Sequence, residues 1–319
     1  MARVFVSCAL PGDALDRLRR EHQVVLGGER IGVRDEAFDR DAERFEAIVS
    51  VVTDRIDAAL LDRAPRLRVV ANVAVGYDNV DVGACRARAI VVTHTPGVLT
   101  EATADLAFGL MIGAARRFVE GDRLLRRGAF AGWTPSLLLG SPVHGATLGI
   151  VGLGRIGQAV ARRARGFGMK VLYAGRRRAS PDVERALSAN ATPVDELFAR
   201  ADFVSLHCPL TPETRHLADA SMLARMKPTA VFVNTARGAC VDEPALAAAL
   251  ASGRPGAAGL DVFEEEPQVH PSLLALENVV LAPHVGSADR PTREAMANLA
   301  VDSVLAVLSG RPPAHPVPQ

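Results

Sequence analysis

The stretch LGIVGLGRIGQAVARRARGFGMKVLYAGRRR, residues 148–178, decides the fold. An apolar run at 148–151 precedes a glycine turn at 152–157, and a helical pattern then leads to a second apolar run at 171–174. Strand, glycine turn, helix and strand in this order form the unit that binds a dinucleotide pyrophosphate at a helix N-terminus. The stretch therefore predicts a Rossmann-type dinucleotide-binding domain.

The residues of the glycine turn are expected to serve the cofactor in different ways. Gly152 permits the tight turn, Gly154 lets the backbone approach the pyrophosphate, and Gly157 allows the helix to pack closely on its strand. Arg155 and Ile156 lie between these glycines at the start of the helix. We include all five residues in the predicted cofactor site.

The end of the second apolar run indicates which dinucleotide binds. An acidic residue at this point would bind the ribose 2′-hydroxyl, but the position holds Gly175, and Arg176, Arg177 and Arg178 follow. A 2′-phosphate needs cationic donors and no nearby carboxylate. We therefore predict NADP as the cofactor, with NAD as the alternative. The competing interpretation is a solvated basic turn, since arginine is abundant throughout the chain.

Length and composition limit the class of protein. The 319 residues suit two domains, and 49% hydrophobic residues provide sizeable cores. A formal net charge of +1 predicts no nucleic-acid or membrane partner, and no apolar stretch approaches the ~20 residues of a membrane span. The four cysteines form no CxxC pair, so we expect reduced, mostly buried thiols and a cytoplasmic location. The histidine spacings fit no metal site.

Strand and helix patterns alternate along the whole chain, which predicts the α/β class with mostly parallel sheets. We expect two doubly wound domains, one flavodoxin-like and one Rossmann-like, with ligand bound in the cleft between them. Residues 1–98 and 287–319 would form the substrate-binding domain, and residues 99–286 the dinucleotide-binding domain. The expected strands are four in the first part (4–9, 47–52, 67–73 and 90–95) and six after it (from 147, 170–174, 203–207, 230–234, 256–262 and 279–282). Helices are expected at 13–21, 56–64, 99–117 and 289–309.

Three ionisable side chains follow expected strands of the dinucleotide-binding domain: Arg237, Glu266 and His284. Strand carboxyl ends are where an open α/β sheet binds its ligands. The arginine can pair with a negatively charged substrate and polarise its carbonyl group. The histidine can supply a proton as hydride arrives at carbon, and the carboxylate can orient the imidazole and favour its charged form. These are the groups that reduction of a 2-oxo acid requires, although each one alone is more simply a surface or loop residue.

Six motifs then carry a resemblance that covers nearly the whole chain. They are VAVGYDNVDV (73–82), GLGRIG (152–157), HCPLTPET (207–214), NTARG (234–238), GLDVFEEEP (259–267) and APHVGS (282–287). The chain resembles the D-isomer-specific 2-hydroxyacid dehydrogenases, and most of all their glyoxylate/hydroxypyruvate reductase branch. The resemblance implies that Arg237 binds substrate, that His284 is the acid/base and that Glu266, which directly precedes Pro267, is its partner.

The resemblance also implies further binding residues. Backbone N–H groups of Val75 and Gly76 would bind the substrate carboxylate, which agrees with a glycine turn after a strand, and Ser287 would contact substrate. Asp261 would reach toward the nicotinamide amide. The cofactor would be lined by Thr103, Pro209, Ala236, Asp261 and Gly286. Asp105 departs from the glutamate that is usual in relatives, which we do not expect to change the chemistry.

The sequence thus predicts NADPH-preferring reduction of small 2-oxo acids, with glyoxylate and hydroxypyruvate as leading substrates. An NAD-dependent dehydrogenase of another 2-hydroxy acid, such as phosphoglycerate, is one alternative, and a non-catalytic NAD(P)-sensing protein like the family's corepressors is another. A homodimer is expected from the resemblance and from the helical stretch 99–117, which is apolar on more than one face. Trp133, the single tryptophan, would either cover the active site or anchor its own loop.

Overall fold

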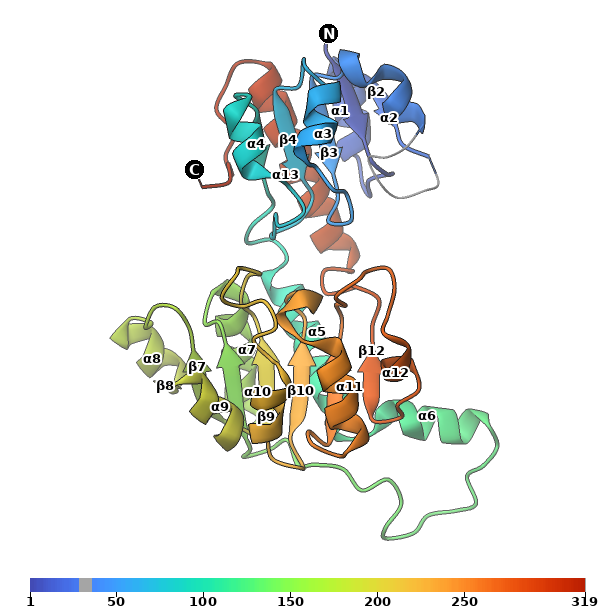
Figure 1. The fold of residues 1–319 in the computed structure, drawn as a ribbon, viewed down its shortest axis with the longest axis vertical. Coiled ribbons are helices and arrows are strands. Elements are labelled where there is room, and N and C mark those ends of the chain that lie inside the picture. Colours follow the sequence, from blue (N-terminus) through green and yellow to red (C-terminus); the bar gives the residue numbers. More distant parts are fainter. Residues whose placement is uncertain (29–35, 319) are drawn as a thin grey trace. The chain divides into compact units, whose positions relative to one another are not determined.

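The stretch 148–178 folds as its pattern predicts, into β6 (Thr147–Val151), a glycine turn, α7 (Arg155–Gly166) and β7 (Lys170–Ala174). The structure is a computed structural model that describes residues 1–28 and 36–318. The chain divides into two compact units, the first of Met1–Leu99 with the chain from Ser287 onward and the second of Thr100–Gly286. Both sheets are wholly parallel, which confirms the predicted fold class of two α/β domains (Figure 1).

The first unit contains a five-stranded sheet in the flavodoxin-like order β2-β1-β3-β4-β5. The strands are β1 (Arg3–Val6), β2 (Gln23–Leu26), β3 (Ala47–Ser50), β4 (Val69–Asn72) and β5 (Val91–Thr93). Helices α1 (Ala14–Glu21) and α13 (Arg290–Leu308) pack on one face, and α2 (Glu36–Asp41), α3 (Ala58–Arg63) and α4 (Val82–Ala87) cover the other. A short 3₁₀ turn, Ala42–Arg44, follows α2. The expectation of four strands was therefore wrong by one, because the edge strand β2 was missed.

The second unit contains a seven-stranded sheet in the order β12-β11-β10-β9-β6-β7-β8. The six expected strands are present, and a seventh, β8 (Ala189–Ala191), adds to the edge beside β7. The other strands are β9 (Phe203–Leu206), β10 (Val231–Asn234), β11 (Ala257–Leu260) and β12 (Val279–Leu281). The strand order reverses between β6 and β9, and the glycine turn follows β6 at this switch point, where such sheets bind ligands.

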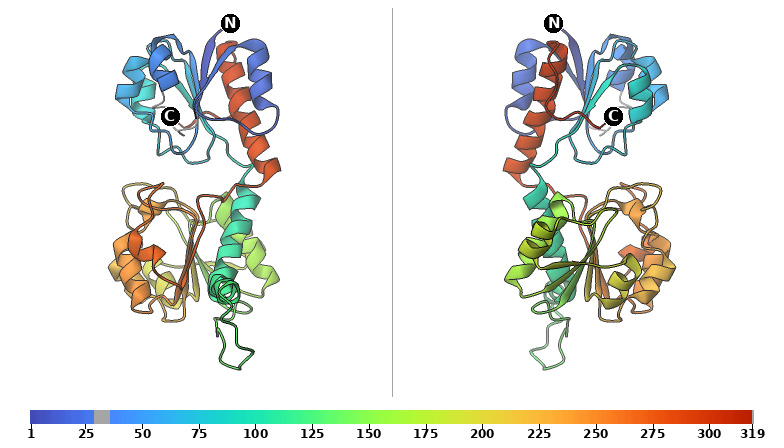
Figure 2. Two further views of the ribbon diagram at one scale, coloured as in Figure 1. Left: turned by 90° about the vertical axis from the view of Figure 1, so that its right-hand side faces the viewer. Right: turned by 90° about the vertical axis from the view of Figure 1, so that its left-hand side faces the viewer.

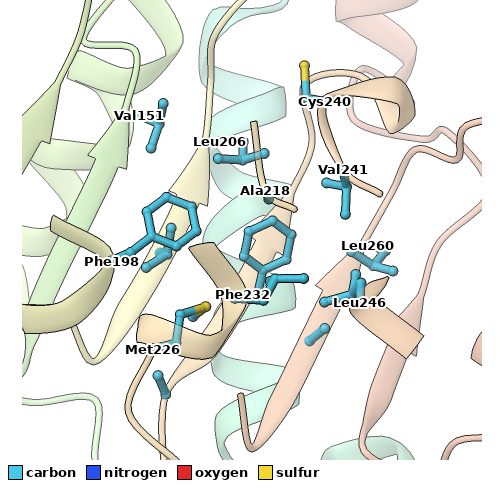
Figure 3. Close-up of a cluster of buried hydrophobic side chains, with 14 of the residues drawn as sticks. Val151, Phe198, Leu206, Ala218, Met226, Phe232, Cys240, Val241, Leu246 and Leu260 are labelled. Carbon is cyan, nitrogen blue, oxygen red and sulfur yellow. The ribbon is translucent and has the colours of Figure 1, made fainter. Parts of the chain in front are cut away.

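Helices cover both faces of this second sheet (Figure 2). One face packs against α5 (Thr100–Ala115), α7 and α8 (Pro181–Leu187), with α6 (Phe118–Arg126) following α5. The other packs against α9 (Val194–Arg200), α10 (Ala220–Arg225) and α11 (Glu243–Ala251), beside which lies the single turn α12 (Pro271–Leu274). On this second face the rings of Phe198 and Phe232 lie 6.5 Å apart between their centroids, within the buried cluster drawn in Figure 3. The sheet is thus packed between two layers of helices.

Helix α5 owes its broad apolar surface to its own unit. It packs on β10, β11 and β12 and against α7, and its buried residues include Phe108, Leu110 and Met111. Its exposed side carries Glu101 and Asp105, which form salt bridges with Arg163 of α7. Burial against a partner subunit is therefore not needed to explain the apolar surface of this helix, and the expected homodimer stays a prediction.

Side-chain caps explain where several helices begin. Five helices start after an aspartate whose carboxylate accepts a hydrogen bond from a backbone N–H in the first turn, and α8 starts after Ser180 in the same way. The capping aspartates are Asp57, Asp81, Asp219, Asp242 and Asp289. These caps pair N–H groups that would otherwise lack a partner, and they end each preceding loop at a defined residue.

The four cysteines are free thiols, and three of them are buried, as expected. Within residues 1–28 and 36–318, no helix has the length and apolar character needed to cross a membrane. The same described residues contain no cluster of histidine, cysteine and carboxylate side chains that could hold a metal ion.

Candidate active site

The glycine turn after β6 has the geometry that a bound pyrophosphate requires. Gly152 has φ +98°, and a Cβ there would lie 2.7 Å from the carbonyl oxygen of His207. A Cβ on Gly157 would lie 2.2 Å from the carbonyl oxygen of Gly152, so neither position accepts a side chain. Beside Gly154, which precedes α7, no described atom lies within 4 Å of where a Cβ would be. The turn therefore leaves open space at the N-terminus of a twelve-residue helix, which fits an anionic dinucleotide.

The arginine run after β7 is exposed, and its members differ in their partners. Arg178 forms a bidentate ion pair with Glu184, in which Nε donates to Oε1 (2.9 Å) and Nη2 donates to Oε2 (3.1 Å). Arg176 and Arg177 form no salt bridge with any described residue. Our expectation that this basic loop has no carboxylate nearby was therefore wrong for Arg178. Gly175 does not have a positive φ, and a Cβ there would meet nothing closer than the Arg177 carbonyl oxygen at 3.7 Å.

Three of the predicted cofactor residues meet at one place. A Cβ on Gly286 would lie 3.1 Å from Oδ2 of Asp261 and 3.5 Å from Cγ2 of Thr103, although these residues come from three different segments. The buried Asp261 carboxylate accepts hydrogen bonds from Val285 N (2.7 Å) and Gly286 N (2.8 Å). Burial raises the pKa of Asp261, and these two N–H donors oppose that rise. Asp261 thus holds the loop after β12 in place, a task that the sequence did not reveal.

The remaining predicted cofactor residues lie at strand ends or at the helix start of the same unit. They are Arg155 and Ile156 at the start of α7, Pro209 after β9 and Ala236 after β10. Near Pro209, the buried Nδ1 of His207 has no hydrogen-bond partner among the described residues, while its Nε2 is hydrogen-bonded to Ser205 Oγ (2.8 Å). Burial lowers the pKa of His207 to about 4. A half-buried, neutral imidazole with one unsatisfied nitrogen at the carboxyl ends of the strands is compatible with a bound polar ligand.

Arg237 is positioned by a tight turn that directly follows β10. Asn234, the last residue of that strand, accepts a hydrogen bond from Ala236 N (3.0 Å) through its side chain. Its Nδ2 donates to the carbonyl oxygen of Arg237 (2.8 Å), so one amide closes the whole turn. Arg237 Nη1 donates to the Ala236 carbonyl oxygen (2.7 Å), and its charge helps lower the pKa of Glu266. The guanidinium is therefore held at the carboxyl edge of the sheet, close to the carboxylate of the next loop.

His284 and Glu266 form a hydrogen-bonded pair across two loops. His284 Nδ1 donates to Glu266 Oε2 (2.8 Å), and Phe263 N donates to Glu266 Oε1 (2.9 Å). Burial opposes ionisation of Glu266, but its hydrogen bond from His284, the charges of His284 and Arg237 and the Phe263 N–H together hold its pKa below the ordinary value. His284 has φ +53°, and its N–H donates to the Asp261 carbonyl oxygen (2.8 Å). Because Nδ1 is occupied, Nε2 is the nitrogen that can exchange a proton with a ligand.

The loops that carry Arg237 and Glu266 are locked together. A Cβ on Gly238 would lie 1.8 Å from the carbonyl carbon of Phe263, so only glycine allows this contact. Buried Glu243 accepts a hydrogen bond from Glu264 N (2.7 Å), and burial raises the pKa of this glutamate. Neither Glu243 nor the role of Asn234 was predicted from the sequence. The signal that could have found Glu243 is its place directly after the helix-capping Asp242, beside the start of a helix.

The expected substrate contacts from the first unit lie after β4. Asn72 Nδ2 donates to the Gly76 carbonyl oxygen (3.0 Å), and His94 Nδ1 is hydrogen-bonded to the Val75 carbonyl oxygen (2.8 Å). The N–H groups of Val75 and Gly76 donate to no backbone carbonyl in the described part of the chain. Ser287 belongs to this unit, and its carbonyl oxygen accepts a hydrogen bond from Arg293 (3.1 Å).

Trp133 and His216 have contrasting environments. The Trp133 side chain is 79% exposed, so it does not anchor its own loop, and that interpretation was wrong. His216 is hydrogen-bonded through Nε2 to Glu264 Oε1 (2.6 Å), and Arg215 joins the same carboxylate. Within the three-glutamate run, Glu264 and Glu266 thus each pair with a different histidine, while Glu265 is exposed.

Comparison with known proteins agrees with this arrangement. Residues 108–286 match the family model described as "D-isomer specific 2-hydroxyacid dehydrogenase, NAD binding domain". A glyoxylate reductase of Korarchaeum cryptofilum is 48% identical, with 99% of this chain and 96% of the relative covered. The solved NADPH-dependent glyoxylate/hydroxypyruvate reductase of Sinorhizobium meliloti, in complex with NADP and malonate, is 37% identical with a TM-score of 0.89, covering 99% of this chain and 96% of that one. D-lactate dehydrogenase of Aquifex aeolicus, complexed with NAD and lactic acid, is 27% identical with a TM-score of 0.85, covering 97% and 96%.

Proposed function

Because this chain belongs to the D-isomer-specific 2-hydroxyacid dehydrogenase family, a family of NAD(P)-dependent oxidoreductases, we propose that it reduces small 2-oxo acids with a preference for NADPH. Glyoxylate and hydroxypyruvate are the proposed substrates, supported by the names of the relatives with which it shares nearly its whole length. The observation that carries the proposal is the His284–Glu266 hydrogen bond, which lies at the carboxyl ends of the strands together with Arg237.

Each member of this group has a separate task. When bound, the nicotinamide cofactor supplies the hydride. Arg237 binds the negatively charged substrate and polarises its carbonyl group. His284 donates a proton from Nε2 to the carbonyl oxygen, while Glu266 keeps Nδ1 protonated and orients the ring. In the proposal, the N–H groups of Val75 and Gly76 and the side chain of Ser287 bind the remainder of the substrate.

The cofactor assignment rests on the turn and the loop after β7. The open side of Gly154 and the start of α7 would hold the pyrophosphate. Thr103, Asp261 and Gly286 would line the rest of the cofactor site, at the carboxyl ends of the strands. The preference for NADPH is supported by the missing acid at Gly175 and by the neighbouring arginines. Four free thiols agree with a reducing compartment, and we keep the cytoplasm as the proposed location.

We further propose that the protein acts as a homodimer through α6 and the segment that follows it. This segment extends away from the sheet of its unit (Figure 1), and no residue of α6 is buried. Six of the eight exposed large hydrophobic residues in the described chain lie here: Phe118, Leu125, Phe130, Trp133, Leu137 and Leu139. Such a patch is typical of a protein interface, and a second copy is the partner expected of a symmetric oligomer. Light scattering coupled to gel filtration tests this, and a monomer mass would contradict it.

One set of assays tests the activity. Oxidation of NADPH and of NADH is followed with glyoxylate, hydroxypyruvate, pyruvate and 3-phosphohydroxypyruvate. We expect the highest kcat/KM with NADPH and either glyoxylate or hydroxypyruvate. We also expect a large loss of kcat in His284→Ala, with NADPH binding retained. Activity only with NADH and 3-phosphohydroxypyruvate would support a phosphoglycerate dehydrogenase instead. Cofactor binding without turnover of any substrate would support a sensing protein.

A further inference from the structure

A buried tyrosine and a glutamate organise the loop that follows β7. Tyr173 is 1% exposed, and its hydroxyl accepts a hydrogen bond from Ala179 N (3.0 Å), which closes the loop 174–179 at its base. The same hydroxyl donates to Glu184 Oε1 (2.6 Å), so the carboxylate of α8 is drawn back against the loop. Burial and the Glu184 hydrogen bond raise the pKa of Tyr173, which keeps the hydroxyl a donor. Glu184 thus has a fixed position that does not depend on arginine.

Arg178 binds to this prearranged carboxylate. The Glu184 side chain is 14% exposed while that of Arg178 is 74% exposed, so the arginine extends from solvent onto a nearly covered acceptor. Both carboxylate oxygens are used, and paired Arg–carboxylate contacts of this form are the geometrically specific ones. Hydrogen bonds from Arg178 and Tyr173 lower the pKa of Glu184, so the carboxylate is ionised at neutral pH. The charge of Arg178 is therefore largely neutralised.

The other two arginines of the loop are differently placed. Arg176 and Arg177 have no salt bridge within residues 1–28 and 36–318. Hydrogen bonds from Thr211 and from its own backbone lower the pKa of Glu213, and the charge of Arg176 lowers it further. An anionic group at this strand end would thus meet two arginines without a salt bridge and a third that Glu184 already holds.

We propose that Glu184 is a specificity-determining residue, which competes with the 2′-phosphate of the cofactor for Arg178 and so limits the preference for NADPH over NADH. The inference rests on the proposed function, because it assumes that the dinucleotide binds at the glycine turn. Arg176 and Arg177 are then the residues that hold the phosphate, and Tyr173 keeps Glu184 in place. The preference for NADPH then depends on how strongly Glu184 competes with the 2′-phosphate for Arg178.

Two small nucleotides isolate the 2′-phosphate from the rest of the cofactor. Binding of 2′,5′-ADP and of 5′-AMP to the full-length protein is measured by calorimetry for the wild type and for Glu184→Gln. Glutamine keeps an oxygen for the Tyr173 hydroxyl but removes the negative charge. We expect 2′,5′-ADP to bind about two- to fivefold more tightly, the range of an exposed ion pair, and 5′-AMP to bind unchanged. Asp182→Asn is the matched control, since it removes a carboxylate of α8 that pairs with Arg185 instead.

Each other result overturns the inference. Weaker 2′,5′-ADP binding in Glu184→Gln would mean that Glu184 aims Arg178 at the phosphate. Equal changes for both nucleotides would mean that it only shapes the loop, and no change would mean that it has no role. Arg176→Gln and Arg177→Gln should each weaken 2′,5′-ADP binding alone, and their failure to do so also contradicts the proposal. If the wild type binds neither NADPH nor NADH, the proposed function itself fails.

Discussion

Replacing Glu266 with glutamine tests the catalytic assignment most directly. The side chain keeps its size, and its oxygen can still accept the hydrogen bond from Phe263 N, which lies 2.9 Å from Oε1. The amide nitrogen would then face His284 Nδ1, now 2.8 Å from a carboxylate oxygen, and two donors cannot pair. We expect the imidazole to lose its orientation and the carboxylate that supports its doubly protonated form, so that Nε2 becomes a weaker proton donor.

The size of the effect follows from the bond that is lost. A hydrogen bond to a charged group contributes about 1.5–3 kcal/mol, which corresponds to a loss of about 10- to 150-fold in kcat. The figure needs no large reduction for solvent screening, since the Glu266 side chain is only 22% exposed. The Kd for NADPH should change little, because the side chains of the pair form no hydrogen bond with the glycine turn that would hold the pyrophosphate.

The measurement is steady-state kcat with NADPH and glyoxylate, beside NADPH binding followed by fluorescence. Glu265→Gln is the matched control, since it changes the adjacent, exposed glutamate and should leave kcat unaltered. A kcat for Glu266→Gln within threefold of the wild type would refute the reasoning. So would an equal loss in Glu265→Gln, because it would show that the acidic loop acts through its total charge.

Three more substitutions test the loop after β7, the His207 imidazole and the contact between Gly238 and Phe263. Gly175→Asp should weaken NADPH binding relative to NADH without strain, because the nearest atom to its Cβ would be the Arg177 carbonyl oxygen at 3.7 Å; equal effects on both Kd values would contradict this. Burial lowers the pKa of His207 from 6.5 to about 4, so the unfolded chain binds a proton that the folded chain does not between these values. The free energy of unfolding should therefore fall as pH drops through that window, and denaturant titrations should show a smaller fall in His207→Asn. Gly238→Ala should lower both the melting temperature and kcat, because its Cβ would lie 1.8 Å from the Phe263 carbonyl carbon. Overpacking of this kind costs about 1–3 kcal/mol of stability. An unchanged melting temperature would show that the two loops can move apart to accept the methyl group.

The sequence predicted most of the fold because its strongest signals are local. The glycine turn, the apolar strands and the two long helices all have patterns that tertiary contacts only reinforce. Strands β2 and β8 were missed because they are short edge strands of four and three residues with little buried surface. The apolar surface of α5 did not indicate that α7 and the sheet cover it, because periodicity measures how much of a helix is apolar and not what packs against it.

The site was predictable in its chemical groups and less so in their support. Motifs indicated Arg237, Glu266 and His284, but not the hydrogen bonds by which Asp261 holds the loop after β12, because those bonds join residues 24 and 25 positions apart in the chain. The turn that Asn234 closes is local, within three residues, and a polar residue before a turn could have indicated it. The pairing of Arg178 with Glu184 spans six residues and depends on how α8 packs beside the loop, which no sequence period records.

The contact between Gly238 and Phe263 has a consequence for how the protein can change. The two segments pack against each other with no spare volume, so a change in the backbone of one requires a matching change in the other. An insertion in either segment would displace its neighbour. Attempts to retarget the enzyme by exchanging segments with a relative should therefore transplant residues 234–243 and 261–267 together. Exchanging one alone would bring in a partner whose shape no longer matches.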